Sequence, residues 1–147
     1  MCRNESKNFR CFKKNAAFKI IVTGYRKQLG AWGEELAVKF LRQRGYTIIA
    51  QNFASRYGEI DIIAFDPRIP DTLCMLEVKT RVSTDFGPPE EAITPNKIKR
   101  LHDTACSYFF QHRIEDRIFR LDAISILLDP ATRRAKIKHI KGINFES

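Results

Sequence analysis

The stretch "GEIDIIAFDPRIPDTLCMLEVKT", residues 58–80, contains two apolar runs separated by a short segment with two prolines. Both runs are rich in aliphatic residues and are bounded by turn residues, which predicts two β-strands joined as an antiparallel hairpin. The turn is expected from Pro67 to Pro70. Each run also carries acidic residues where a half-buried strand would place hydrophobic ones. The hairpin is therefore a candidate functional site as well as a structural element.

The register of this hairpin brings acidic residues together. Symmetry about Ile69 pairs Asp61 with Glu77 and Glu59 with Lys79. Side chains alternate along a strand, so Glu59 and Asp61 share one face of the first strand, and Glu77 and Lys79 share one face of the second. Directly opposed Cβ atoms lie about 4.5–5.5 Å apart, where like charges are destabilising. The two carboxylates therefore need a shared proton or a cation between them.

A divalent cation is the more informative of these two solutions. One or two carboxylates, with waters and a substrate phosphate, are the usual ligands of Mg²⁺ in proteins. Lys79 lies two residues beyond Glu77, where its ammonium could stabilise charge on a phosphate or orient water. The alternative is a purely structural salt-bridge cluster, in which Glu59 pairs with Lys79 and Asp61 faces solvent. Spacing alone leaves both interpretations open.

The rest of the chain supplies the elements that would surround this hairpin. Helical spacing of apolar residues and a terminating Gly45 predict a first helix over residues 30–45. Thr94 and Pro95 are typical of a helix start, so a second helix is expected to follow them. Three further strands are predicted over residues 46–53, 117–129 and 134–142. This order predicts an α/β protein with a mixed sheet of about five strands flanked by helices.

Charge divides the chain into two parts. The formal net charge is +9, but residues 1–28 contain eight Lys or Arg and the single acid Glu5, so the remaining 119 residues carry only about +2. We therefore expect a basic N-terminal arm over residues 1–28 and one domain over residues 29–147. The arm is compatible with binding nucleic acid, with binding a membrane surface, or with a solvated or disordered tail.

Several functional classes find no support in the sequence. The four cysteines form no CxxC pair, which suits reduced thiols, and the three histidines lack the spacing of a zinc site. No run approaches the roughly 20 apolar residues needed to cross a bilayer. We therefore expect a cytoplasmic protein that does not span a membrane. The histidines, interpreted as ordinary surface or core residues, are His102, His112 and His139.

Five segments together carry a resemblance to a known family. They are, in order, "WGEELAVKFLRQRGY", "GEIDIIAFD", "LEVKTR", "FGPPEEAITPNK" and "FRLDAISI". Their sequence resembles the YraN-like family of small bacterial proteins over roughly residues 28–143. The order of an acid, a gap, and Glu-x-Lys on the adjacent strand also resembles the PD-(D/E)xK nuclease superfamily, whose fold type II restriction enzymes and Holliday junction resolvases share. The resemblance therefore implies a restriction endonuclease-like fold.

The resemblance also implies roles for individual residues. Asp61 and Glu77 would bind Mg²⁺ or Mn²⁺, with the Val78 carbonyl as a further ligand. Lys79 would position water or stabilise the transition state. Glu34 matches the helical glutamate that members of the superfamily use beside the metals, although an acid near a helix start is also explained by the helix dipole. Glu59, in the "GEID" segment, would orient Lys79 rather than bind metal.

The expected partner is DNA, in single-stranded, flapped or branched form. Lys97 and Arg81 are the candidate phosphate contacts, and a solvated side chain is the alternative for Lys97. The resemblance implies a metal-dependent endonuclease; the alternatives are a non-catalytic DNA-binding module in repair, recombination or uptake, and a protein-interaction scaffold. An enzyme that cuts junctions would need two active sites and hence a homodimer. Asp122 lies in a family-like segment without an evident chemical role.

Overall fold

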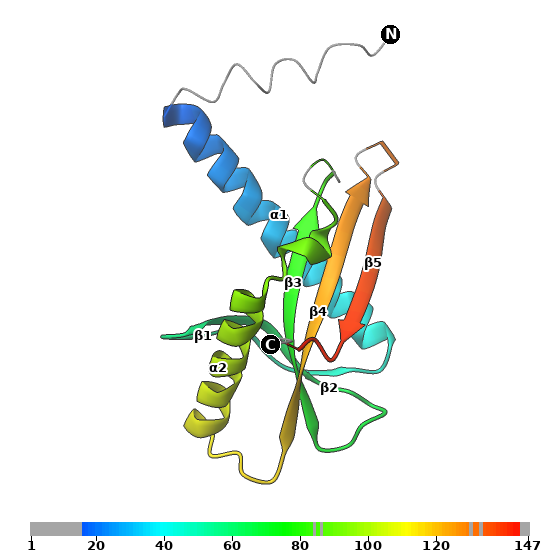
Figure 1. Ribbon diagram of the computed structural model, residues 1–147. Coiled ribbons are helices and arrows are strands. Elements are labelled where there is room, and N and C mark those ends of the chain that lie inside the picture. The colour runs from blue at the N-terminus through cyan, green and yellow to red at the C-terminus, as the bar shows by residue number, and fades with distance from the viewer. Residues whose placement is uncertain (1–15, 84, 86, 130, 133, 145–147) are drawn as a thin grey trace.

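The computed structural model describes residues 16–83, 85, 87–129, 131–132 and 134–144, with side chains described from residue 24 onward. The predicted α/β architecture is confirmed: a mixed sheet in the order β1-β2-β3-β4-β5 is flanked by two helices (Figure 1). The helical elements are α1 (Ala16–Gln43), the 3-10 helix η2 (Pro89–Ala92) and α2 (Pro95–Gln111). The strands are β1 (Thr47–Ser55), β2 (Gly58–Phe65), β3 (Thr72–Arg81), β4 (Ile118–Asp129) and β5 (Arg134–Lys141).

The strand pairing follows the predicted hairpin. β2 and β3 are antiparallel, with pairs from Ile62↔Leu76 to Phe65↔Leu73, which confirms the predicted register over these residues. β3 and β4 are parallel, because the chain between them crosses over one face of the sheet through η2 and α2. β5 returns antiparallel to β4 at the edge of the sheet.

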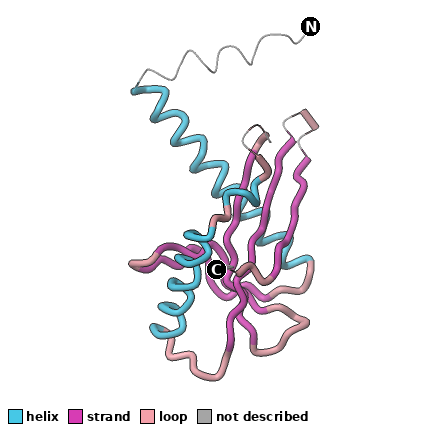
Figure 2. Tube along the Cα trace, viewed as in Figure 1, coloured by secondary structure: helices cyan, strands magenta, loops and turns pink. Residues whose placement is uncertain are grey.

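The two helices cover opposite faces of the sheet (Figure 2). On one face, Cys74, Leu76 and Val78 of β3 pack into the core cluster that contains residues of α1. On the other face, Leu73 and Met75 pack into the cluster that contains residues of α2. Since side chains alternate along a strand, residues 77 and 79 continue the row of residues 73 and 75 toward the α2 side. The acidic half of β3 therefore lies just beyond the hydrophobic core of that face.

Helix α1 differs from its prediction. It begins at Ala16 rather than near residue 30, so the expected boundary at residue 28 lies inside the helix. Gly24 and Gly30 do not stop it, because an internal glycine weakens a helix by only about 1 kcal/mol relative to alanine. Trp32 belongs to the apolar spacing that predicts this helix, yet its side chain is 44% exposed. The first half of the expected arm, residues 1–15, lies outside the described residues.

Helix α2 agrees closely with its prediction. The Thr94 hydroxyl accepts a hydrogen bond from the Lys97 backbone N–H at 3.4 Å, and Pro95 occupies the first turn. Most members of the apolar stripe of α2 are buried, whereas Phe109 is only half-buried. These buried members are Ile98, Leu101, Ala105 and Tyr108. Within the part of the chain that the structure describes, no helix has the length and apolar character needed to cross a bilayer.

The structure places two of the four cysteines and all three histidines. Cys74 is a buried free thiol and Cys106 an exposed one, while Cys2 and Cys11 lie outside the described residues. His139 belongs to a polar network in the interior, described below, and His102 and His112 lie on α2 or at its end.

Candidate functional site

The site begins where β2 and β3 separate. The last backbone pair of this hairpin is Ile62↔Leu76, and one residue further the two strands are linked by a side chain instead. There the Asp61 carboxylate accepts a hydrogen bond from the Val78 N–H at 2.6 Å. Continuing the register by one step places Asp61 opposite Glu77, as the sequence predicts. The divergence of the two strands thus makes room for a carboxylate inside the sheet.

Lys79 contacts the acid next to it on the same face. Its ammonium lies 2.5 Å from a carboxylate oxygen of Glu77, and both side chains are largely shielded from solvent. The expected pairing of Lys79 with Glu59 is wrong. β2 has turned toward β1 at this level, so Glu59 pairs with Ala54 in the sheet and its side chain is exposed.

These side chains line one groove. It has a volume of about 410 Å³ and lies between the β1–β2 turn and the first turns of α2. Three acidic side chains line it, from β2 and β3: Glu59, Asp61 and Glu77. Four basic side chains complete its charged lining: Arg56, Lys79, Lys97 and Arg100. Four of the predicted site residues therefore share one groove, although they come from three separate elements.

Two further residues of the groove, Arg56 and Arg100, were not predicted from the sequence. Arg100 had a usable signal, because it follows Lys97 by one helical turn and residues three apart lie on the same side of a helix. Its guanidinium donates to the Tyr57 carbonyl at 3.1 Å, which fastens α2 to the β1–β2 turn. Arg56 lies in that turn and had no comparable signal.

The electrostatics of the groove are dominated by Asp61. Burial and the negative charge of Glu77 raise its pKa to about 7, against the lowering effects of the Val78 N–H and of Lys79. The Glu34 carboxylate adds a smaller upward effect on this pKa. Near neutral pH the Asp61 carboxyl is therefore close to the point at which it gains or loses its proton.

Glu34 reaches this region from the other helix. It is half-buried on α1, while its neighbour Glu35 is exposed. The preceding residue, Gly33, allows α1 to approach β3 closely, because a Cβ there would overlap the Thr80 side chain. Glu34 is thus close enough to influence Asp61, although it does not line the groove.

The two predicted phosphate contacts have different positions. Lys97 lines the groove, and burial followed by repulsion from Lys79 lowers the pKa of its ammonium. Arg81 also contributes to that lowering, but it does not line the groove. Its guanidinium donates to the Gly87 carbonyl at 2.8 Å and so holds the loop that leads into η2.

The groove supplies oxygen donors that suit the implied metal. Among the described residues, no three His, Cys, Asp or Glu side chains gather closely enough to form a metal site by themselves. Asp61 and Glu77 supply two carboxylates, and Val78 supplies a third oxygen. The Val78 N–H faces Asp61, and the N–H and C=O of one strand residue point to the same side, so its carbonyl faces the same opening. Such hard oxygen donors suit Mg²⁺ or Mn²⁺, so the residues present fit.

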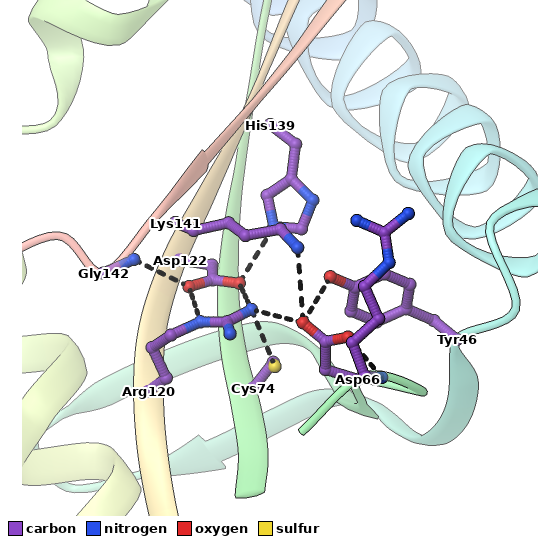
Figure 3. A network of polar contacts seen from close by, with 9 residues as sticks. Tyr46, Asp66, Cys74, Arg120, Asp122, His139, Lys141 and Gly142 are labelled. Carbon is purple, nitrogen blue, oxygen red and sulfur yellow. Dashed lines mark hydrogen bonds and ion pairs between the residues drawn. The ribbon is translucent and has the colours of Figure 1, made fainter. Parts of the chain in front are cut away.

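A second polar cluster lies on the α1 side of the sheet (Figure 3). Arg120 bonds both oxygens of Asp122, at 2.7 and 2.8 Å, and also contacts Asp66 at 3.1 Å. Asp122 is fully buried and Asp66 nearly so. We call this set the buried network; its remaining members are Tyr46, Cys74, His139, Lys141 and the Gly142 N–H. It gives Asp122 a structural role that the sequence did not reveal.

Fold and groove together define the class of protein. It is an α/β protein whose five-stranded mixed sheet is consistent with a restriction endonuclease-like fold, with an acidic pair and a lysine where two central strands diverge. Residues 33–126 match the model of the uncharacterised protein family UPF0102. The chain belongs to this family, as the YraN-like resemblance predicts.

Individual relatives support this assignment. The chain is 44% identical over 117 residues to a UPF0102 protein of Syntrophomonas wolfei, covering 78% of this chain and 95% of the relative. It is 40% identical over 120 residues to a UPF0102 protein of Nocardia farcinica, covering 82% and 91% respectively. A UPF0102 protein of Chlorobium limicola is 46% identical over 101 residues, which is 69% of this chain and 76% of the relative.

Proposed function

We propose that this protein is a divalent-metal-dependent nuclease of the PD-(D/E)xK type that hydrolyses DNA phosphodiesters in the groove between the β1–β2 turn and α2. One observation carries the proposal. Asp61, Glu77 and Lys79 converge on a single groove, and Lys97 lines it from the helix opposite. Acidic oxygens for a cation, a shielded ammonium and further positive charge for phosphates are the parts that such chemistry requires.

Each residue has a specific role in this proposal. Asp61, Glu77 and the Val78 carbonyl hold Mg²⁺ or Mn²⁺, which when bound supplies a Lewis acid and a more acidic water. Lys79, already held 2.5 Å from Glu77, stabilises the negative charge that develops on the phosphate or orients the attacking water. Glu34 adds negative charge beside this pair, which favours a bound cation.

The surrounding basic residues bind the DNA backbone. We assign phosphate contacts to Lys97, Arg100 and Arg56, all of which line the groove. Arg81 holds the neighbouring loop instead. Contacts to phosphates carry no sequence information, so recognition rests on charge and on DNA shape and is salt-dependent. We place this activity in the cytoplasm, where a homodimer would be required only if the substrate is a four-way junction.

A non-catalytic DNA-binding module is the second candidate. The observation that favours it is the Glu77–Lys79 ion pair, which neutralises one carboxylate without a metal. A proton on Asp61 would then satisfy the other. In that case the groove would hold single-stranded or branched DNA for a partner in repair, recombination or uptake.

A cleavage panel tests the proposal. Linear, flapped, bubbled and four-way DNA are incubated with the protein in Mg²⁺, in Mn²⁺ and in EDTA, and we expect cleavage only with metal. Lys79→Met should lower the rate by about 100-fold or more, as expected when a group that stabilises transition-state charge is removed. Lys99→Met is the matched control, because Lys99 is exposed on α2 and does not line the groove.

The outcomes separate the two candidates. Asp61→Asn and Glu77→Gln should both abolish metal-dependent cleavage. Cleavage at the wild-type rate in both variants would overturn the nuclease. Tight binding of DNA by the wild-type protein without cleavage in either metal would support the binding module.

A further inference from the structure

A second depression of about 810 Å³ lies beside the groove of the candidate site, farther along α2. One wall is the β1–β2 turn, with Ser55, Arg56 and Tyr57, and the other is a stripe of α2 that includes Ser107 and Phe110. Ser55 and Arg56 line both depressions, so the two lie next to each other at the β1–β2 turn. For a chain-like ligand bound in the groove, the second depression is therefore the neighbouring hollow along α2.

Two exposed aromatic rings flank this second depression. Phe110 is 86% exposed and Tyr57 is 37% exposed, although both are large side chains that ordinarily bury much of their surface. The guanidinium of Arg56 lies 4.7 Å from the centre of the Tyr57 ring. These aromatic rings and the planar guanidinium are suited to binding a flat ligand that stacks on them.

The rest of the lining suits a polar, planar ligand. Asp103, Ser107 and Gln111 present hydrogen-bonding groups from α2 to the same depression. Arg56, which lines both depressions, and Arg100, which lines the groove, supply positive charge beside it. An unpaired nucleotide combines the features that this lining recognises: an aromatic face, a polar edge and a negatively charged backbone.

We propose that the second depression binds unpaired bases of a single-stranded DNA segment whose backbone continues into the candidate site, with Tyr57 and Phe110 as the stacking platform. This inference rests on the proposed function and adds the substrate class. A base within a duplex already has both faces covered by its neighbours, whereas an unpaired base has a free face for an aromatic side chain. The depressions together therefore select DNA with an unpaired tail, flap or gap.

Helix geometry sets the length of the unpaired segment. Phe110 follows Lys97 by thirteen residues, which corresponds to about 20 Å along the axis of α2. Stacked nucleotides advance about 3.4 Å along a strand, so this span corresponds to roughly six nucleotides. Tails much shorter than this should not reach from the site to Phe110.

Equilibrium binding in EDTA separates this inference from catalysis. The probe is a fluorescent oligothymidylate of ~15 nucleotides, compared with an abasic strand of the same length and charge. Stacking of one base contributes about 5- to 150-fold in affinity, so Phe110→Ala and Tyr57→Ala should each weaken oligothymidylate binding by a factor in this range. Phe110→Tyr and Tyr57→Phe should restore it.

The controls exclude a general effect of removing an exposed ring. Tyr25, on α1, is 55% exposed, and Tyr25→Ala should bind oligothymidylate as the wild type does. Because Phe110 is so exposed, Phe110→Ala is expected to fold normally, which circular dichroism and thermal melting can verify. For the wild-type protein, affinity should also rise with tail length up to roughly six nucleotides and then level off.

The outcomes distinguish this inference from the nuclease proposal. Unchanged oligothymidylate binding in both alanine variants, or equal wild-type affinity for the abasic strand, would overturn the stacking platform. If DNA is cleaved but neither alanine variant changes cleavage or binding, the nuclease proposal is supported and the stacking platform is contradicted. If binding depends on both rings but no DNA is cleaved, the stacking platform is supported and the nuclease proposal is contradicted.

Discussion

Asp61 lies near the start of β2 and Asp66 just beyond its end, yet their pKa values move in opposite directions. Burial by itself acts to raise the pKa of both carboxyls, and their other contacts decide the net direction. At Asp61, the charge of Glu77 adds to burial and the pKa reaches about 7. At Asp66, hydrogen bonds from the Arg68 N–H, Tyr46 and Arg120 overcome burial and hold the pKa well below its usual range.

The difference lies in how each negative charge is compensated. In the buried network, Arg120, Lys141 and His139 surround Asp66 and Asp122, so the acids are satisfied by the protein itself. In the groove, the negative charges of Asp61 and Glu77 lie close together, and Lys79 forms its ion pair with Glu77. A fully compensated cluster is suited to holding strands together. An under-compensated cluster is suited to accepting a cation from outside.

The largest expected effect comes from breaking the buried network. Arg120→Met should lower the free energy of unfolding by about 3–5 kcal/mol, because it leaves Asp122 buried without its main partner. Urea denaturation at neutral pH measures this loss. Arg42→Met, at an exposed position of α1, is the matched control and should cost less than about 1 kcal/mol. Equal losses in the two variants would contradict the structural role of the network.

Replacing the acids at the two ends of β2 should change the stability of the protein in opposite directions. In metal-free buffer at pH 8, Asp61→Asn should stabilise the protein by up to about 4 kcal/mol, since a raised pKa of about 7 means that ionised Asp61 opposes folding. An asparagine can still accept the hydrogen bond from Val78. Asp66→Asn should instead destabilise at the same pH, because it removes a carboxylate that the folded state favours.

The pH dependence fixes the sign of both effects. The folded protein retains the proton of Asp61 up to about pH 7, whereas the unfolded chain loses it near pH 4, so stability falls as pH rises between these values. The gain from Asp61→Asn should therefore shrink toward pH 5. The contribution of Asp66 is present above the pKa of the unfolded chain and is lost only as pH falls toward its lowered folded value. Thermal melts from pH 5 to pH 8 test this, and a pH-independent gain for Asp61→Asn would contradict it.

The local sequence pattern was sufficient to predict the β2–β3 hairpin and the placement of Asp61 opposite Glu77 in the site. Alternation and a symmetric turn determine the register of β2 and β3, and that register alone brings Asp61 near Glu77. It did not predict that β2 would turn away beyond Ile62 to follow β1, which is why the pairing of Glu59 with Lys79 failed. Strand curvature depends on packing across the whole sheet rather than on the hairpin sequence.

The buried network and the basic side of the groove could not be predicted in the same way. Asp66 and Asp122 look like ordinary strand-end or strand charges until Tyr46, Arg120 and Lys141 come together from distant parts of the chain. Arg56 likewise becomes informative only when the β1–β2 turn lies against α2. Contacts of this kind are products of the tertiary structure and leave no local signal.

The smallest expected effect concerns Glu34, which joins the groove only electrostatically. Because its charge makes the smallest of the contributions that raise the pKa of Asp61, Glu34→Gln should lower this pKa slightly, and Glu77→Gln should lower it by clearly more. Carboxyl ¹³C NMR titration in EDTA measures both shifts. Glu35→Gln is the control, since Glu35 is exposed on the same turn of α1. A shift from Glu34→Gln as large as that from Glu77→Gln would place Glu34 inside the carboxylate pair, and no shift at all would remove it from the site.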